Sequence, residues 1–140
     1  RVIQKGQQAC IISLGARLEE CKLAAEQLKN KGVSTTIIDA RFAKPLDQEL
    51  ILKCARDHEV VITIEEGSIG GFGSHVKNLL AEKGIFDMGL KFRSMKLPDT
   101  FIDQDTPKKM YELAGLNSKH ITKKILDALF TKDTIKVVKK

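Results

Sequence analysis

The sequence of 140 residues lacks tryptophan, has a single tyrosine, and contains no apolar run close to the ~20 residues that span a membrane. Residues 1–8 carry no hydrophobic signal core, so nothing in them marks the chain for export. We therefore expect no membrane partner and a cytoplasmic location.

The net charge of +6 raises the question of a nucleic-acid partner, but the distribution of the charge argues against one. Half of the excess lies in the last ten residues, and basic and acidic residues interleave elsewhere. Phosphate binding needs clustered basic residues, and base stacking needs aromatic side chains, of which the chain has few. We expect no nucleic-acid partner.

The cysteines, Cys10, Cys21 and Cys54, form no C-x-x-C pair, and each lies in an apolar stripe. Cysteine in such a position acts as a small buried hydrophobe, and an odd, scattered count suits a reducing compartment. Core filling is therefore favoured over a catalytic thiol at all three positions. No spacing in the sequence resembles a set of metal ligands, so no metal site is expected.

Short apolar runs alternate with amphipathic segments along a chain that is 42% hydrophobic and 30% charged. Strands are expected at residues 9–14, 34–39, 60–64 and 90–97, the last an edge strand with basic residues, and at 2–3. Helices are expected at residues 18–31, 47–57, 74–83 and 118–130, with another beginning at Thr106 and Pro107. This order predicts one α/β domain over residues 1–130, with right-handed crossovers in a parallel sheet. Residues 131–140 are expected to form a flexible basic tail.

In parallel sheets of this kind, ligands bind beyond the carboxyl ends of the strands, where the strand order reverses. If strand 9–14 is central, the reversal lies between it and strand 60–64. The segments that leave the strand ends are residues 15–17, 40–42 and 65–67.

The stretch 65–75, EEGSIGGFGSH, is the most distinctive in the chain, with four glycines between a strand and a helix. It could cradle a phosphate on backbone N–H groups, admit another polypeptide at close range, or be a plain connection. No phosphate-loop pattern matches, and two adjacent carboxylates would repel a phosphate, so the second interpretation is favoured. The candidate interface or active-site-mouth loop comprises Glu65, Glu66, Gly67, Gly70, Gly71, Gly73, Ser74 and His75.

Side chains at these strand ends allow further expectations. Glu65 and Glu66 point to opposite faces on an extended chain, so they form no dyad, which leaves one for a cleft and one for a structural partner. His75 is the one histidine placed to act, with an interface role favoured over catalysis. Arg41 could reach a carboxylate or phosphate, although a salt bridge to Asp39 or Asp47 is favoured.

Four stretches together resemble the C-terminal domain of the 1-deoxy-D-xylulose-5-phosphate synthase family, within the transketolase-like, thiamine-diphosphate-dependent enzymes. They are IISLGARLEECKLAAEQL (11–28), DARFAKPLD (39–47), HEVVITIEEGSIGGFGSHV (58–76) and LPDTFIDQDTPKKMYELAGL (97–116). The second and third are the most specific, and the end of the chain beyond residue 130 resembles nothing in the family.

The resemblance implies a three-layer α/β/α domain whose mixed five-stranded sheet is mostly parallel, with one short antiparallel strand at residues 2–4. It also implies a bacterial, cytoplasmic, homodimeric transferase that joins pyruvate to D-glyceraldehyde 3-phosphate, releases CO₂ and supplies isoprenoid, thiamine and pyridoxal synthesis. Thiamine diphosphate and Mg²⁺ carry that chemistry, and the family holds both in its N-terminal and central domains.

By this resemblance, the chain supplies no catalytic, cofactor-binding or metal-binding residue. It supports the dimer and the neighbouring domains, and it is inactive alone. The alternative is a free-standing α/β binding or adaptor module with the same fold. Arg1 is not a natural start residue, which favours the enzyme, and an open reading frame that continues upstream would decide between the two.

Overall fold

A computed structural model gives the structure of this protein, and it describes residues 1–41, 46–66, 71–96 and 115–130. The strands are β1 (Val2–Gln4), β2 (Ala9–Ser13), β3 (Thr35–Asp39), β4 (Val60–Ile64) and β5 (Lys91–Met95). They form one sheet in the order β1-β3-β2-β4-β5. β1 runs antiparallel to β3, and the other pairs are parallel. The expected mixed five-stranded sheet is confirmed.

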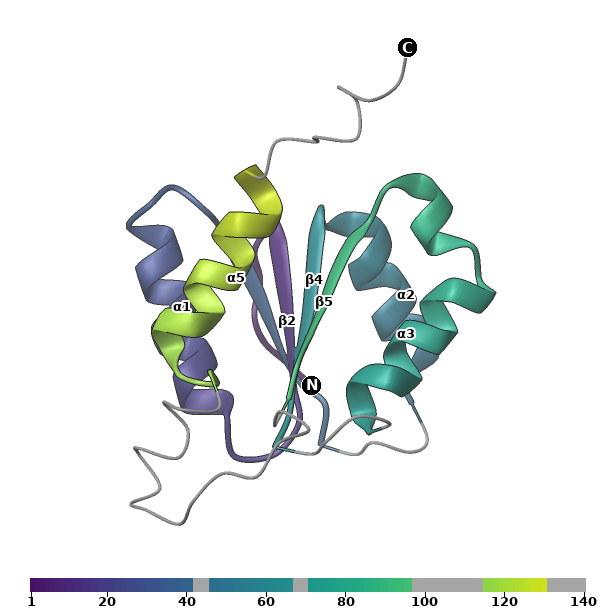
Figure 1. The fold of residues 1–140 in the computed structure, drawn as a ribbon, viewed down its shortest axis with the longest axis horizontal. Coiled ribbons are helices and arrows are strands. Elements are labelled where there is room, and N and C mark those ends of the chain that lie inside the picture. Colours follow the sequence, from purple (N-terminus) through teal and green to yellow (C-terminus); the bar gives the residue numbers. More distant parts are fainter. Residues whose placement is uncertain (42–45, 67–70, 97–114, 131–140) are drawn as a thin grey trace.

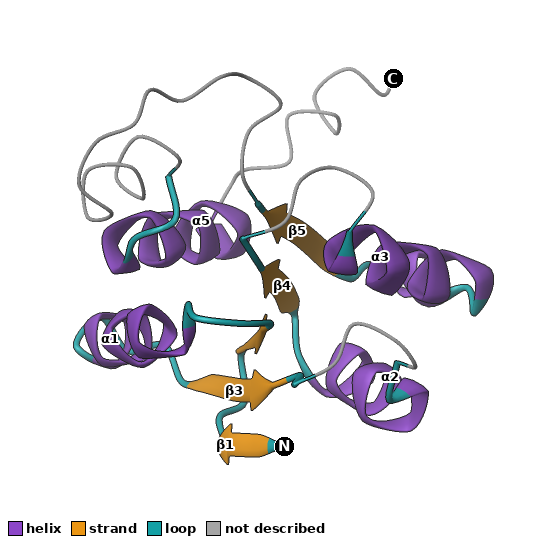
Figure 2. Ribbon diagram, turned by 90° about the horizontal axis from the view of Figure 1, so that it is seen from below, coloured by secondary structure: helices purple, strands orange, loops and turns teal. Residues whose placement is uncertain are grey.

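The described helices are α1 (Leu18–Lys29), α2 (Gln48–Asp57), α3 (Phe72–Glu82), α5 (Ser118–Phe130) and the short 3₁₀ helix η1 (Ile85–Met88). Figures 1 and 2 show α1 and α5 on one face of the sheet and α2 and α3 on the other. The expected three layers are therefore present. None of the described helices has the length and hydropathy needed to cross a membrane.

The sheet separates two apolar clusters, one beneath each pair of helices. On β2, Ile11 packs into the α1/α5 cluster, whereas Cys10 and Ile12 pack into the α2/α3 cluster. Because successive strand residues face opposite sides, a strand covered on both faces needs an apolar residue at nearly every position. β2 and β4 are buried at every residue, which explains why they read as continuous apolar runs.

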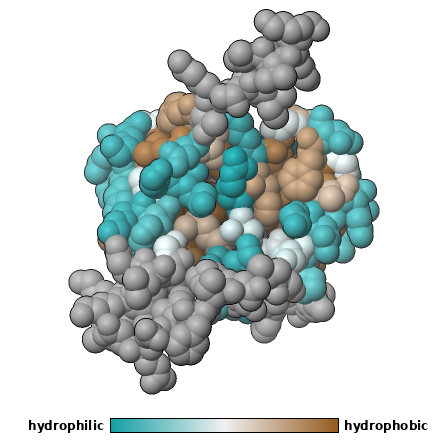
Figure 3. Space-filling view, viewed as in Figure 1, coloured by the Kyte–Doolittle hydropathy of each residue, from teal (hydrophilic) through white to brown (hydrophobic). Residues whose placement is uncertain are grey.

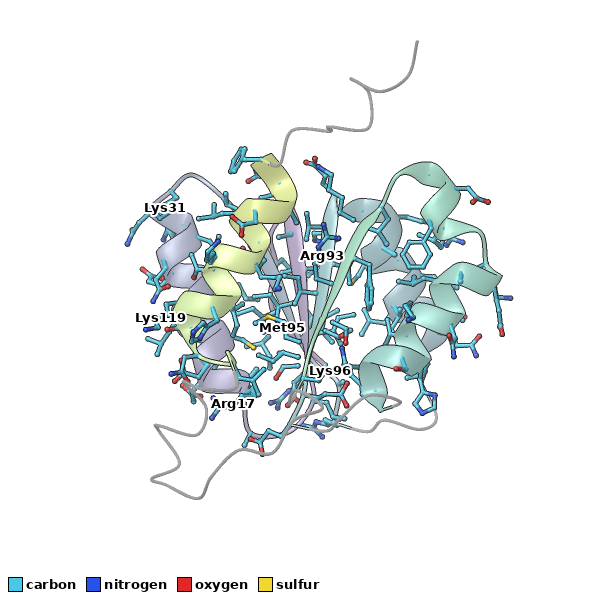
Figure 4. All side chains as sticks on the ribbon, viewed as in Figure 1. Arg17, Lys31, Arg93, Met95, Lys96 and Lys119 are labelled. Carbon is cyan, nitrogen blue, oxygen red and sulfur yellow. The ribbon has the colours of Figure 1, made fainter. Side chains whose placement is uncertain are left out.

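β5 lies at the edge of the sheet, as its basic residues predict. Arg93 is exposed along this strand (Figure 4), and a charged side chain there discourages pairing with another chain. Beside it, Phe86 and Phe92 pack edge to face with their ring centroids 6.1 Å apart. Apolar surface gathers on this side of the molecule (Figure 3).

Two helix boundaries differ by two residues from the sequence-based expectation. α1 ends at Lys29, two residues early, and Gly32 follows with a φ of +80° that favours glycine. α3 begins at Phe72 and not at Ser74, because its first turn is capped by a distant side chain that local spacing does not reveal. The helix expected at Thr106 and Pro107 and the tail at 131–140 lie outside the described residues.

The two-sided burial of β2 predicts a large effect from a single truncation. Ile11→Ala should lower the free energy of unfolding by about 2–5 kcal/mol, because it leaves a cavity in a side chain that is 0% exposed. The matched control is Leu23→Ala on the outside of α1, where Leu23 is 54% exposed and a change within about 0.5 kcal/mol is expected. Urea denaturation would measure both, and equal losses would contradict the placement of β2.

Candidate functional site

The candidate site lies at the carboxyl edge of the sheet, the lower edge in Figure 1. β2 is the central strand, and the chain passes from β2 to β3 on one side and then crosses to β4 on the other. The strand order therefore reverses between β2 and β4, as expected. The ladder continues beyond the strands there, with Leu14 N–H donating to Ile64 O at 3.0 Å. This edge is where the segments after β2, β3 and β4 converge.

Glu65 fixes the start of α3 at this edge. Its side chain is buried, with the residue 3% exposed, and one carboxylate oxygen accepts a hydrogen bond from Phe72 N–H at 2.9 Å. The other oxygen accepts from Gly73 N–H. A helix N-terminus carries unpaired N–H groups and a partial positive charge, so a carboxylate is a favourable cap there.

The same contacts bear on the phosphate interpretation of the loop. Phe72 and Gly73 donate to Glu65, while the N–H groups of Ser74 and His75 both donate to Gly71 O, at 3.1 and 3.2 Å. Every backbone donor of this first turn is thus already used inside the chain. A carboxylate occupies the position that a bound phosphate would need, which weighs against a phosphate cradle at the described part of this loop.

Two of the loop glycines can be judged on geometry. A Cβ built on Gly73 would lie 2.8 Å from Thr63 Oγ1 and closer still to Ser94 Oγ, so a larger residue would require these side chains or α3 to shift. Gly71 has a φ of −83°, which other residues adopt, so no left-handed conformation requires glycine at that position. Gly67 and Gly70 lie outside the described residues.

Glu66 points to the other face, as its position beside Glu65 predicts. Its carboxylate lies 3.6 Å from the Nε of Arg17, whose residue is only 8% exposed. Arg17 also donates from a terminal nitrogen to Leu116 O at 3.4 Å, just before α5. Figure 4 shows Arg17 and Lys96 at this same edge. Arg17 therefore ties together the segments that follow β2 and β4 and precede α5.

Arg17 was not among the predicted site residues, although it follows a strand end and precedes a helix. That position is the signal that sequence reasoning could have used. Its partners could not be read from the sequence, because Leu116 is 99 residues away along the chain.

The favoured salt bridge of Arg41 is wrong, because both candidate carboxylates have other partners. Asp39 accepts a hydrogen bond from the guanidinium of Arg1 at 3.4 Å, and from Arg41 it accepts the backbone N–H at 3.3 Å. Asp47 caps α2 by accepting from Leu50 N–H at 3.1 Å. Arg41 has a φ of +58°, and the residue is exposed where the chain leaves β3.

Arg41 and Phe72 line the same cavity of about 190 Å³ between the sheet and α2. Ile12, Ile38 and Phe72 make its inner wall apolar, whereas Arg1, Arg41 and Asp47 add charged groups, of which Arg1 is paired with Asp39. A cavity with this lining can accept an apolar side chain that carries a carboxylate nearby. The structure thus brings Arg41 beside the first residue of α3, two features that the sequence placed on separate stretches.

His75 lies half-buried in the first turn of α3. Within the described part of the chain, no hydroxyl or thiol is hydrogen-bonded to its imidazole. The preference for a structural or interface role over catalysis at His75 stays a prediction.

The described residues do not fit thiamine diphosphate or Mg²⁺. The N-termini of α2, α3 and α5 are each already capped by a carboxylate, from Asp47, Glu65 and Glu20 respectively. One group of possible metal ligands does assemble in the described part, Cys10, Cys54 and His58, with ligand atoms within 4.8 Å of one another. Sulfur and imidazole are not the oxygen ligands that Mg²⁺ requires. Sequence spacing missed this cluster because its members come from β2 and from the end of α2.

Fold and edge together define a three-layer α/β domain in which carboxylates of the chain cap the N-termini of α2, α3 and α5. The family model "Transketolase, C-terminal domain" matches residues 1–121. The chain belongs to the transketolase C-terminal domain family.

Two solved structures show the same fold. A structure described as "Split gene transketolase, inactive beta4 tetramer" has a TM-score of 0.83 and 30% identity over 92% of this chain. Transketolase from Campylobacter jejuni has a TM-score of 0.56 and 16% identity over 88% of this chain. The chain covers 41% of the first protein and 17% of the second, so it spans less than half the length of either.

The Glu65 cap predicts a specific loss of stability. Glu65→Ala should lower the free energy of unfolding by about 1–3 kcal/mol, because two buried N–H groups of α3 lose their acceptor. Glu65→Gln should cost less, since its amide retains one acceptor oxygen. The control is Glu26→Ala on the exposed side of α1, expected within about 0.5 kcal/mol. Calorimetry would measure all three, and a neutral Glu65→Ala would show that the cap is dispensable.

Proposed function

We propose that this chain is the C-terminal domain of a 1-deoxy-D-xylulose-5-phosphate synthase, and that its carboxyl edge faces the other domains of that enzyme. The synthase joins pyruvate to D-glyceraldehyde 3-phosphate, with loss of CO₂, for isoprenoid, thiamine and pyridoxal synthesis. The family membership supports a transketolase-type assembly, and the stretches 39–47 and 65–74 support this particular reaction.

The observation that carries the proposal is the convergence of those two stretches on one cavity. Arg41 from the first and Phe72 from the second line it together, at the edge where parallel sheets meet their ligands. Its apolar wall suits a side chain from a neighbouring domain or subunit, and the exposed Arg41 at its rim suits a carboxylate beside that side chain. Because Glu65 holds α3 in place, this surface is already formed before a partner docks.

Thiamine diphosphate and Mg²⁺ would be held by the N-terminal and central domains, since the described residues here do not fit them. Those domains would lie on the same polypeptide or on a separate one, as the name of the split-gene transketolase illustrates. The two-carbon chemistry belongs to the bound cofactor, and the role of this domain is to position its neighbours. A homodimer is the expected assembly.

The direct test is an assay of the protein that carries this chain together with its upstream domains. With pyruvate, D-glyceraldehyde 3-phosphate, thiamine diphosphate and Mg²⁺, it should release CO₂ and form the five-carbon product. The 140-residue chain alone should release none. Turnover by the isolated chain would contradict the assignment of the site. A complete assembly that ignores pyruvate would contradict the reaction, and a reading frame that starts at this domain with no partner gene would indicate an adaptor module.

A second prediction tests whether the glycine loop contacts another domain or subunit or only connects β4 to α3. Gly71→Val should cost the isolated chain less than about 1 kcal/mol, because Gly71 has an ordinary φ and lies before α3. In the complete enzyme it should lower turnover or dimerisation at least about tenfold, equivalent to ~1.4 kcal/mol, if a partner backbone approaches there.

The matched control for Gly71→Val is Ser68→Ala in the same loop, which adds no branched Cβ. Thermal melting of the isolated chain and activity of the complete enzyme form the decisive pair of measurements. Unfolding of the isolated chain would mean that Gly71 serves local geometry, and no effect on either would place the interface elsewhere.

A further inference from the structure

Two cysteines that the proposed function does not use meet on the α2/α3 side of the sheet. Cys10 lies on β2 and is 0% exposed, and Cys54 lies on α2 and is 5% exposed. Their sulfur atoms and a ring nitrogen of His58 lie within 4.8 Å of one another. The two thiols therefore lie close together across the boundary between strand and helix.

The two sulfurs differ in access. A cavity of about 230 Å³ has Cys54 in its wall, together with Lys53, Asp57 and His58 from the end of α2 and Gly6 from the loop before β2. That volume is several times the ~30 Å³ that one water molecule occupies in the liquid, so a small polar molecule can enter. Cys10 is absent from the wall of this cavity and lies behind Cys54 in the core.

The two sulfurs also differ in the direction in which their surroundings shift the pKa. The hydrogen bond from Cys10 lowers the pKa of Cys54, whereas the hydrogen bond to Cys54 and then burial raise the pKa of Cys10 well above its ordinary value. Cys21 provides an internal comparison, because burial on the other side of the sheet raises its pKa to about 12. The thiolate is the reactive form of cysteine, so Cys54 is the nucleophile of the pair.

His58 completes the cluster without offering a ligand. Its Nδ1 lies 2.7 Å from Cys54 O, and its Nε2 lies 2.7 Å from Thr36 Oγ1 and 3.2 Å from Gly6 O. Both ring nitrogens are therefore engaged with oxygen atoms of the protein. A metal ion at the two sulfurs would have to break one of these bonds, which favours thiol chemistry over metal binding.

We propose that Cys54 and Cys10 are a peroxide-sensitive thiol pair, with Cys54 as the attacking residue and Cys10 as the resolving residue. The Cys54 sulfur attacks one oxygen of hydrogen peroxide, the O–O bond breaks, and a sulfenic acid and one water result. The Cys10 sulfur then attacks the Cys54 sulfur, the S–O bond breaks, and the second water leaves with the thiol proton. Peroxide is reduced to two waters, and the two thiols are oxidised to a disulfide that links β2 to α2.

The test uses the 140-residue chain with equimolar hydrogen peroxide, followed by alkylation of the remaining thiols and mass spectrometry. The expected product has lost two hydrogen atoms and yields linked tryptic peptides that contain Cys10 and Cys54. A dithiol reductant should reverse it. Cys54 should be oxidised at least about tenfold faster than Cys21, because Cys21 stays protonated and buried.

Three variants separate the roles. Cys10→Ser should leave a sulfenic acid at Cys54, trapped by a diketone reagent, and Cys54→Ser should leave Cys10 unoxidised. Cys21→Ser is the matched control and should form the disulfide at the wild-type rate. If either of the first two variants fails to fold, the relative alkylation rates of Cys54 and Cys21 in the wild type still test the proposal.

Three results would overturn the proposal. The first is a free Cys54 thiol after excess peroxide in a chain that circular dichroism shows to be folded. The second is oxidation of Cys21 as fast as Cys54. The third is stoichiometric Zn²⁺ that protects Cys10 and Cys54 from alkylation, which would assign the cluster to a metal.

Discussion

The carboxylate of Glu65 at the N-terminus of α3 is the contact on which the carboxyl edge depends. A buried carboxylate needs hydrogen-bond donors, and a helix N-terminus needs acceptors, so each group removes the desolvation penalty of the other. Gly73 lets the helix approach closely enough for this contact. With Glu65 turned toward α3, the next residue faces the opposite side of the sheet, where Glu66 meets Arg17. One interaction thus orients side chains on both faces of the sheet.

Most of the charged and polar groups that the structure describes at the carboxyl edge are therefore paired within the chain. Carboxylates of the chain cap the N-termini of α2, α3 and α5, where a phosphate group would otherwise bind, and the buried Arg17 before α1 has a carboxylate beside it. Near the cavity, Arg41 is exposed, whereas Arg1 is paired with Asp39 and Asp47 caps α2. This pattern suits contact with another protein surface more than capture of a small anion. It agrees with a transketolase-type C-terminal domain that supports its neighbours.

Residues that act through short-range patterns could be predicted from the sequence, and residues that act through distant partners could not. The sequence located the core and the edge of the sheet correctly from the apolar runs of β2 and β4 and the basic residues of β5. Burial on two faces requires apolar residues at consecutive positions, which a sequence shows directly. The start of α3 was missed because its cap lies seven residues upstream, and the partner of Arg41 was wrong because Asp39 binds Arg1 instead. The pairing of Cys10 with Cys54 depends on how α2 packs on the sheet, which no spacing records.

The antiparallel direction of β1 determines where a preceding domain would join this one. Because β1 runs against β3, its start lies beside the end of β3, where Val2 pairs with Ile38 and Asp39 N–H donates to Arg1 O at 2.8 Å. Any polypeptide joined before Arg1 would enter at the carboxyl edge, beside Arg41 and the cavity. A domain delivered there by a short tether would experience a high effective concentration at that surface. Weak contacts at the edge would then be enough for docking, and the direction of one short strand would set which face of the domain is presented to its neighbour.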